Sequence, residues 1–112
     1  MRKDKYLWVT ASKAKAGKEK EFNKWYDQHV TTFFQFPGLR RVSRNRCFNP
    51  FEFGDICAQY LTIYEFDNKE ALEAFSKSEV MKIAKKEYDE GYEEVAEHLW
   101  TGWWEPMKTL ER

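Results

Sequence analysis

Long apolar segments are lacking from this chain of 112 residues. No run approaches the roughly 18 apolar residues that are needed to cross a bilayer. Residues 1–5 are mostly charged and contain no apolar region of the kind found in secretory signals. The sequence therefore predicts a cytoplasmic protein that does not span a membrane.

An excess of charge of either sign is also lacking. Lysine and arginine together number 19, aspartate and glutamate together number 19, and the formal net charge is zero. A chain without net charge has no general attraction to phosphate backbones or to anionic lipids. Nucleic acids and membrane surfaces are therefore not expected as partners.

Signatures of cofactors and metals are scarce as well. The chain has two cysteines, Cys47 and Cys57, and no other residue completes a metal-ligand spacing around them. Its two histidines, His29 and His98, fall on different predicted helices, which is a weak basis for a metal site. Neither a P-loop nor a glycine-rich dinucleotide fingerprint is present. We expect reduced cysteines, no metal and no cofactor.

Aromatic residues, in contrast, are abundant. They make up 18% of the chain, with five tryptophans, six tyrosines and nine phenylalanines. A chain of this length is expected to form one domain, residues 1–112, which is too small for separate cofactor and substrate domains. A core of this size does not use all of these rings. Some of them are therefore expected to line a ligand pocket or a subunit interface.

The predicted order of elements is strand, helix, strand, strand, helix, strand. A Pro-Gly pair at positions 37 and 38 ends the first helix. Capping boxes at residues 67–70 and 76–79 predict the start of the second helix and a break within it. The predicted strands are residues 6–11, 39–48, 56–66 and 100–107, and the predicted helices are residues 18–36 and 67–99.

This order predicts an α+β, ferredoxin-like βαββαβ fold, in which a four-stranded antiparallel sheet carries two helices on one face. The other face of the sheet is then bare. If Leu7 and its alternate neighbours face the helices, the bare side receives an aromatic stripe of Tyr6, Trp8, Thr10, Ala58, Tyr60, Thr62 and Tyr64. The sequence alone does not decide whether this set of residues or the alternate set faces the helices. Because exposed aromatic surface tends to associate, we expect a homodimer in which two sheets pack face to face.

One predicted helix carries a histidine within an aromatic stripe. At about 100° per residue, six side chains share one helical face: Phe22, Trp25, Tyr26, His29, Phe33 and Phe36. Burying an imidazole without a partner costs about 1 to 3 kcal/mol, and its ordinary pKa of about 6.5 suits proton transfer at neutral pH. His29 is therefore the candidate base. The alternative is a structural imidazole bonded to a backbone carbonyl or to a tyrosine.

Other polar residues have competing interpretations. Tyr26 lies about 60° from His29 on the helical wheel, and it is either a wall residue or a hydroxyl that binds a substrate oxygen. Asp27 lies about 160° from His29, so a bond between them is not expected and a solvated charge is the better interpretation. His98 is interpreted as a histidine stabilised by the dipole at a helix C-terminus. The arginines of residues 40–46 suit a phosphate or carboxylate site, but the better interpretation is solvated charges on an edge strand, balanced by Glu and Asp partners.

Two parts of the sequence resemble one known family. The segment F-N-K-W-Y-D-Q-H-V, followed by F-P-G-L-R-R, is similar to the helix-one signature of the EthD-like branch of the dimeric α+β barrel superfamily. The run from Leu61 to Glu79 resembles the third strand and second helix of that family. One residue separates Asp27 from His29 here, which shifts their register by one relative to the family pattern. The resemblance covers residues 5–107.

This resemblance implies a small homodimer with a pocket in each subunit between sheet and helices. It also implies flat, hydrophobic, oxygenated substrates. Related proteins include cofactor-independent polyketide cyclases, monooxygenases, isomerases and accessory proteins of poorly defined activity. Family resemblance alone therefore does not select the reaction.

The predicted function is that of a small cofactor-independent lyase, isomerase or cyclase. His29 would act as general acid or base, with Tyr26 as the second catalytic residue. The hydrophobic aromatic or polyketide-like substrate would contact Phe22, Trp25, Phe33 and Tyr92. The alternatives are a cofactor-free monooxygenase and a non-enzymatic dimer that binds a hydrophobic metabolite or a haem-like ligand.

Overall fold

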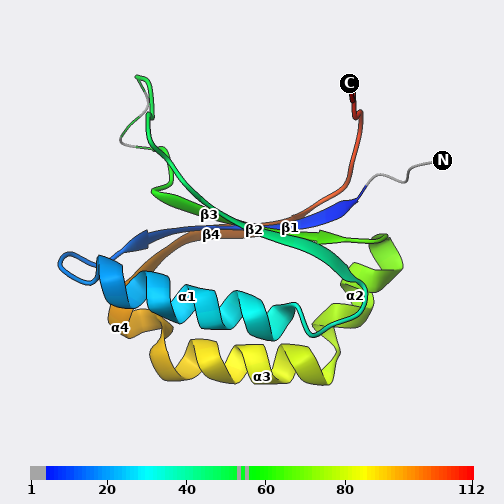
Figure 1. Ribbon diagram of the computed structural model, residues 1–112, viewed down its shortest axis with the longest axis horizontal. Coiled ribbons are helices and arrows are strands. Elements are labelled where there is room, and N and C mark those ends of the chain that lie inside the picture. Colours follow the sequence, from blue (N-terminus) through cyan, green and yellow to red (C-terminus); the bar gives the residue numbers. More distant parts are fainter. Residues whose placement is uncertain (1–4, 53, 55) are drawn as a thin grey trace.

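The computed structural model describes residues 5–52, 54 and 56–112 (Figure 1). Its strands are β1 (Tyr6–Ala14), β2 (Leu39–Arg46), β3 (Tyr60–Phe66) and β4 (Ala96–Trp104). Its helices are α1 (Glu19–Phe33), α2 (Lys69–Ser76), α3 (Glu79–Glu87), the π-helical turn η1 (Tyr88–Tyr92) and the short α4 (Glu93–Val95). Within this part of the chain, no helix is long and apolar enough to cross a membrane.

The four strands form one antiparallel sheet in the order β2-β3-β1-β4. The helices cover one face of this sheet, and Figure 1 shows the β2–β3 connection and the C-terminal segment rising on the opposite side. The predicted ferredoxin-like α+β fold is therefore confirmed. The second helical region differs in being divided into shorter pieces.

The strand side chains face opposite to the assignment that the sequence favours. Trp8 packs edge-on against Phe33 and Phe75 under the helices, with ring centroids 5.8 Å apart in both pairs. Tyr64 stacks on Phe33 at 4.2 Å. Because alternate residues of a strand face opposite sides, Leu7 faces the bare side. The large rings fill the wide space between the layers and the aliphatic side chains remain outside. The same correction applies to Tyr6, Thr10, Tyr60 and Thr62.

Two clusters of buried side chains join the helices to the sheet. One surrounds Phe33, Phe66 and Phe75, and the other surrounds Phe22 and Tyr92. Burying one such apolar side chain stabilises the fold by about 1.5 to 3 kcal/mol. Since α1 contributes Phe22 to one cluster and Phe33 to the other, its aromatic stripe anchors the whole length of the helix.

The break that the sequence predicts at residues 76–79 is present. Helix α2 ends at Ser76, and the Ser78 hydroxyl caps α3 by accepting a backbone N–H at 3.1 Å. The capping residue of α2 is Asn68, one residue after the predicted Asp67. Asp67 instead pairs with Arg40, and the adjacent guanidinium lowers the pKa of Asp67 to about 2.

The second helical region ends earlier than the sequence predicts. Residues 88–92 form a π-helical turn, and the chain is extended from Ala96 onward, so residues 96–99 belong to β4. β4 pairs with β1, and the register shifts between Ala11 and Ser12, which is a β-bulge. This pairing satisfies backbone N–H and C=O groups along the edge of β1. A continued helix would leave that edge open.

The other boundaries differ from the predictions by a few residues. Helix α1 ends at Phe33, before a turn that leads into Pro37. β1 continues to Ala14, β2 ends at Arg46 and β3 begins at Tyr60. The connection between β2 and β3 is therefore longer than the sequence predicts.

Candidate active site

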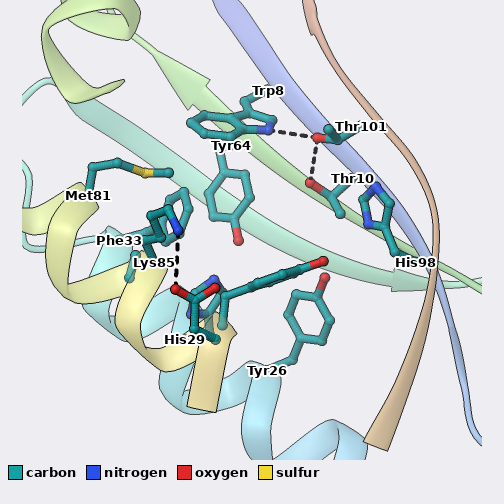
Figure 2. Close-up of a pocket in the computed structure, with 13 residues that line it drawn as sticks. Trp8, Thr10, Tyr26, His29, Phe33, Tyr64, Met81, Lys85, His98 and Thr101 are labelled. Atoms are coloured by element: carbon teal, nitrogen blue, oxygen red, sulfur yellow. Dashed lines mark hydrogen bonds and ion pairs between the residues drawn. The ribbon is translucent and has the colours of Figure 1, made fainter. Parts of the chain in front are cut away.

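A cavity of about 330 Å³ lies between α1, α3 and the helix-facing side of the sheet. Figure 2 shows side chains from these elements converging on it. Its aromatic lining is Trp8, Tyr26, Phe33, Tyr64 and Tyr88. Small-molecule pockets span roughly 300 to 1,000 Å³, so this cavity suits a small ligand with a largely apolar surface.

Helix α1 positions His29 in the wall of this cavity. The residue is only 7% exposed, because the helical period turns the imidazole toward the sheet with the aromatic stripe. Trp25 stacks on the imidazole with ring centroids 4.3 Å apart, and Phe33 contacts it at 5.0 Å. These two rings fix the orientation of the imidazole.

Glu87, the last residue of α3, is the hydrogen-bond partner of His29. Nδ1 of His29 lies 2.8 Å from Oε1 of Glu87, and the hydroxyl of Thr32 donates to Oε2 at 2.6 Å. A carboxylate accepts, so we assign the proton to Nδ1 and the free lone pair to Nε2. Nε2 forms no hydrogen bond with any residue that the structure describes, and the ring lines the cavity.

Burial lowers the pKa of His29 below its ordinary value, because the imidazolium loses hydration. The hydrogen bond and the negative charge of Glu87 raise this pKa but do not outweigh burial. His29 is therefore neutral at neutral pH, and Nε2 is able to accept a proton. Glu87 is placed to stabilise the imidazolium that results.

Two tyrosine hydroxyls provide hydrogen-bond donors. Figure 2 shows Tyr64 reaching from the sheet toward the α1 side of the cavity, with Tyr26 rising from α1. Burial raises the pKa of Tyr64 well above its ordinary value and also raises that of Tyr26. Both hydroxyls therefore remain protonated at neutral pH. Tyr64 has no hydrogen-bond partner in the part of the chain that the structure describes.

A second polar group lies on the sheet side of the cavity. The hydroxyl oxygens of Thr10 and Thr101 are 3.0 Å apart, and Trp8 Nε1 donates to Thr101 at 2.8 Å (Figure 2). The bulge in β4 turns His98 to this side, where it lines the cavity. The interpretation of His98 as a residue at a helix C-terminus is therefore wrong.

The residues predicted to bind substrate are only partly brought together. Phe33 lines the cavity, as do the predicted catalytic residues His29 and Tyr26. Phe22 and Tyr92 are 0% and 1% exposed, and both pack against the ring of Tyr26 in the interior. These two side chains pack behind the residues that line the cavity and do not line it themselves. Trp25 packs against the imidazole of His29 in the same way.

Asp27 and Arg44 lie outside the cavity. The side chain of Asp27 is 76% exposed, as the helical wheel predicts, and lies 3.5 Å from Arg44. The interpretation of Arg44 as a solvated edge charge is wrong, because its side chain is only 16% exposed. Its guanidinium lies 4.7 Å from the ring centroid of Tyr26 and packs there as a cation–π contact.

Sequence reasoning missed Glu87 and Tyr64. Glu87 is one of many acidic residues in its region and lies 58 positions from His29, so no local spacing marks it. Tyr64 would have followed from the correct parity of β3. Among the residues that the structure describes, no group of three or more His, Cys, Asp or Glu side chains is arranged to hold a metal ion.

No protein-family model and no curated protein sequence matches the chain. Solved structures do match. SnoaB from Streptomyces nogalater, described as a cofactor-independent oxygenase, is 15% identical over 98% of this chain and 100% of its own, with a TM-score of 0.70. An EthD-family protein from Bacillus halodurans is 15% identical over 94% of this chain and 100% of its own, with a TM-score of 0.69.

A third structure extends the comparison. A DABB-family protein with a ferredoxin-like fold from Mesorhizobium loti is 11% identical over 95% of this chain and 100% of its own, with a TM-score of 0.71. At these identities the likeness establishes the fold, and a fold does not fix an activity. The chain therefore shares the ferredoxin-like α+β fold of these solved structures.

Proposed function

We propose that this chain is a small cofactor-independent enzyme that transfers a proton on a hydrophobic, oxygenated substrate in lyase, isomerase or cyclase chemistry. The observation that carries the proposal is the 2.8 Å hydrogen bond between His29 and Glu87 beside an aromatic cavity. A carboxylate that orients a neutral imidazole toward a largely apolar pocket is the arrangement expected of a general base.

The proposed first step removes a proton from a carbon next to a carbonyl group. Nε2 of His29 takes the proton, and the electrons of the broken C–H bond form the C=C bond of an enolate. Glu87 compensates the charge of the imidazolium. The enolate oxygen accepts hydrogen bonds from neutral hydroxyls, for which Tyr64 and Tyr26 are the donors in the cavity wall.

The fate of the enolate sets the reaction class. Return of the proton from His29 to a different carbon gives an isomer. Departure of a group from the neighbouring carbon, with the proton of His29 transferred to that group as its bond to carbon breaks, gives a lyase product. Attack of the enolate carbon on a second carbonyl of the same molecule closes a ring, and the new alkoxide takes the proton from His29. Each route returns His29 to its neutral form.

A cofactor-free oxygenase is the second candidate. The support for it is the fold shared with SnoaB, which is described as a cofactor-independent oxygenase. The same deprotonation by His29 would give an electron-rich phenolate or enolate, which transfers electrons directly to O₂. Consumption of O₂ in an oxygen-electrode assay distinguishes this route from isomerisation, cleavage or cyclisation.

Hydrogen–deuterium exchange into 2-tetralone tests the shared proton-transfer step. This bicyclic aromatic ketone has acidic C–H bonds next to its carbonyl, and NMR in D₂O follows their exchange. We expect the protein to accelerate exchange and His29→Gln to lower the accelerated rate by roughly 10²-fold or more. Quenching of tryptophan fluorescence measures binding, which the variant should retain. An unchanged exchange rate would refute the role of His29 as base.

Asp27→Asn is the matched control on the same helix. It removes one negative charge from α1, but the side chain of Asp27 is 76% exposed and does not line the cavity. We expect its exchange rate to stay close to that of the unaltered protein. Equal losses in both variants would indicate damage to α1 rather than loss of a base. Binding without accelerated exchange would identify a non-enzymatic binding protein.

We propose in addition that two copies assemble through the bare face of the sheet. Register and alternation place apolar side chains there: Leu7, Val9, Leu61, Ile63, Trp100 and Trp104. In Figure 1 the β2–β3 connection and the C-terminal segment rise on the side of the sheet opposite to the helices. Exposed apolar surface of this kind is typical of protein interfaces.

A further inference from the structure

The two cysteines lie at the two ends of the connection between β2 and β3. Cys47 directly follows β2, and Cys57 lies shortly before β3. Both are exposed, so packing in the core does not explain them. Their Sγ atoms are 3.4 Å apart, compared with about 2.0 Å in a disulfide bond. The two sulfur atoms are therefore in contact but not bonded.

Hydrogen bonds hold the backbone beside these cysteines. The N–H of Cys47 donates to the carbonyl of Gln59 at 2.9 Å, which continues the β2–β3 pairing beyond Arg46. The side chain of Gln59 accepts the backbone N–H of Ala14 in β1, also at 2.9 Å. Gln59, at the end of the connection, is thus hydrogen-bonded both to Cys47 and to β1. These bonds hold the backbone near both thiols in place.

We propose that Cys47 and Cys57 form a reversible redox site, in which a hydroperoxide or a small-molecule disulfide oxidises the pair to an intramolecular disulfide. With hydrogen peroxide, one thiolate attacks a peroxide oxygen, becomes a sulfenic acid and releases hydroxide, which takes up a proton to form water. The second thiol attacks the sulfenic sulfur, and a second water leaves. The pair loses two electrons and two protons. With glutathione disulfide, thiol exchange releases two molecules of glutathione.

The cross-link closes residues 47–57 into a covalent ring. Figure 1 shows the β2–β3 connection rising on the bare side of the sheet. The connection forms one wall of a groove of about 500 Å³, and Leu99 and Trp100 of β4 form part of the opposite wall. Oxidation therefore adds a covalent constraint to the wall of this groove that contains Cys47 and Cys57. Neither cysteine lines the cavity that contains His29.

Intact-mass spectrometry of the full chain tests the proposal. The protein is reduced, freed of reductant and incubated with an excess of glutathione disulfide. We expect the loss of two hydrogen atoms, about 2 Da, without a glutathione adduct. Peptide mapping should place the bond between Cys47 and Cys57, and dithiothreitol should restore the original mass. Because the measurement is a mass, its outcome does not depend on the proposed enzymatic activity.

Cys47→Ser and Cys57→Ser are the matched controls. Each variant has a single cysteine and cannot form the intramolecular disulfide, so each should retain one glutathione adduct. An unaltered protein that keeps both thiols free, carries two adducts or forms disulfides between chains overturns the proposal. Circular dichroism confirms that the two variants are folded.

Discussion

Replacement of Glu87 by glutamine isolates the contribution of this carboxylate to the proposed base. Its two oxygens lie 2.8 Å from Nδ1 of His29 and 2.6 Å from the hydroxyl of Thr32. Glutamine has nearly the same shape and still offers one acceptor oxygen, so we expect Glu87→Gln to fold. The variant lacks the negative charge that stabilises the imidazolium formed during proton transfer.

The size of the effect follows from the burial of the pair. The side chains of His29 and Glu87 are 9% and 24% exposed, so water screens their interaction only weakly. A hydrogen bond to a charged group contributes about 1.5 to 3 kcal/mol. Since about 1.4 kcal/mol corresponds to a tenfold change in rate, we expect exchange into 2-tetralone to slow by roughly 10- to 150-fold.

The pH profile of exchange provides a second measurement on the same variant. His29 must be neutral to accept a proton, so the rate rises with pH through the pKa of His29. Glu87 raises that pKa against the larger effect of burial. In Glu87→Gln the pKa falls, so the acidic limb should move to lower pH while the plateau drops. A folded variant with an unchanged plateau and an unmoved limb would refute the proposed role of Glu87.

Three further outcomes are expected. Tyr64→Phe removes a hydroxyl from the cavity but keeps the ring that stacks on Phe33 at 4.2 Å. The rate of exchange should fall by roughly 10²-fold, with little change in the midpoint of thermal unfolding. An unchanged rate would show that another group donates to the enolate oxygen. Burial lowers the pKa of His29 in the folded chain, so the unfolded chain takes up the extra proton and stability should fall as the pH drops below about 6.5. Denaturant titrations at several pH values measure this fall, and His29→Gln should flatten it by up to about 1.4 kcal/mol per pH unit. Light scattering at micromolar concentration should give twice the mass of one chain, and Ile63→Lys on the bare face should give a monomer; a monomeric unaltered protein would contradict the assembly.

The α1 side of the candidate site is predictable because its information is local. His29, Tyr26 and Phe33 share a face at helical spacing, and all three line the cavity. The break before α3 is local as well, since the hydroxyl of Ser78 caps a helix that begins at the next residue. In both cases the interacting groups lie within a few positions of one another in the chain.

The parity of β1 is not predictable in the same way. Leu7 and Trp8 both suit a buried face. Because side chains alternate between the two faces of a strand, the sequence pattern fits equally well with either residue facing the helices. The choice depends on what lies opposite. Phe33 and Phe75 leave a space that the ring of Trp8 fills, with centroids 5.8 Å from each. This packing also brings Tyr64 into the cavity.

Periodicity and turn signals thus specify the order of elements, the ferredoxin-like fold and the aromatic face of α1 that carries His29, because they act between neighbours in the chain. Contacts between distant segments specify the rest. Glu87 meets His29 across 58 positions only after α1 and α3 pack on the same face of the sheet. Residues 96–99 become strand because β1 offers an unpaired edge, and the bulge in that pairing turns His98 into the cavity. Such contacts depend on which surfaces the folded layers bring together, and no local pattern records that.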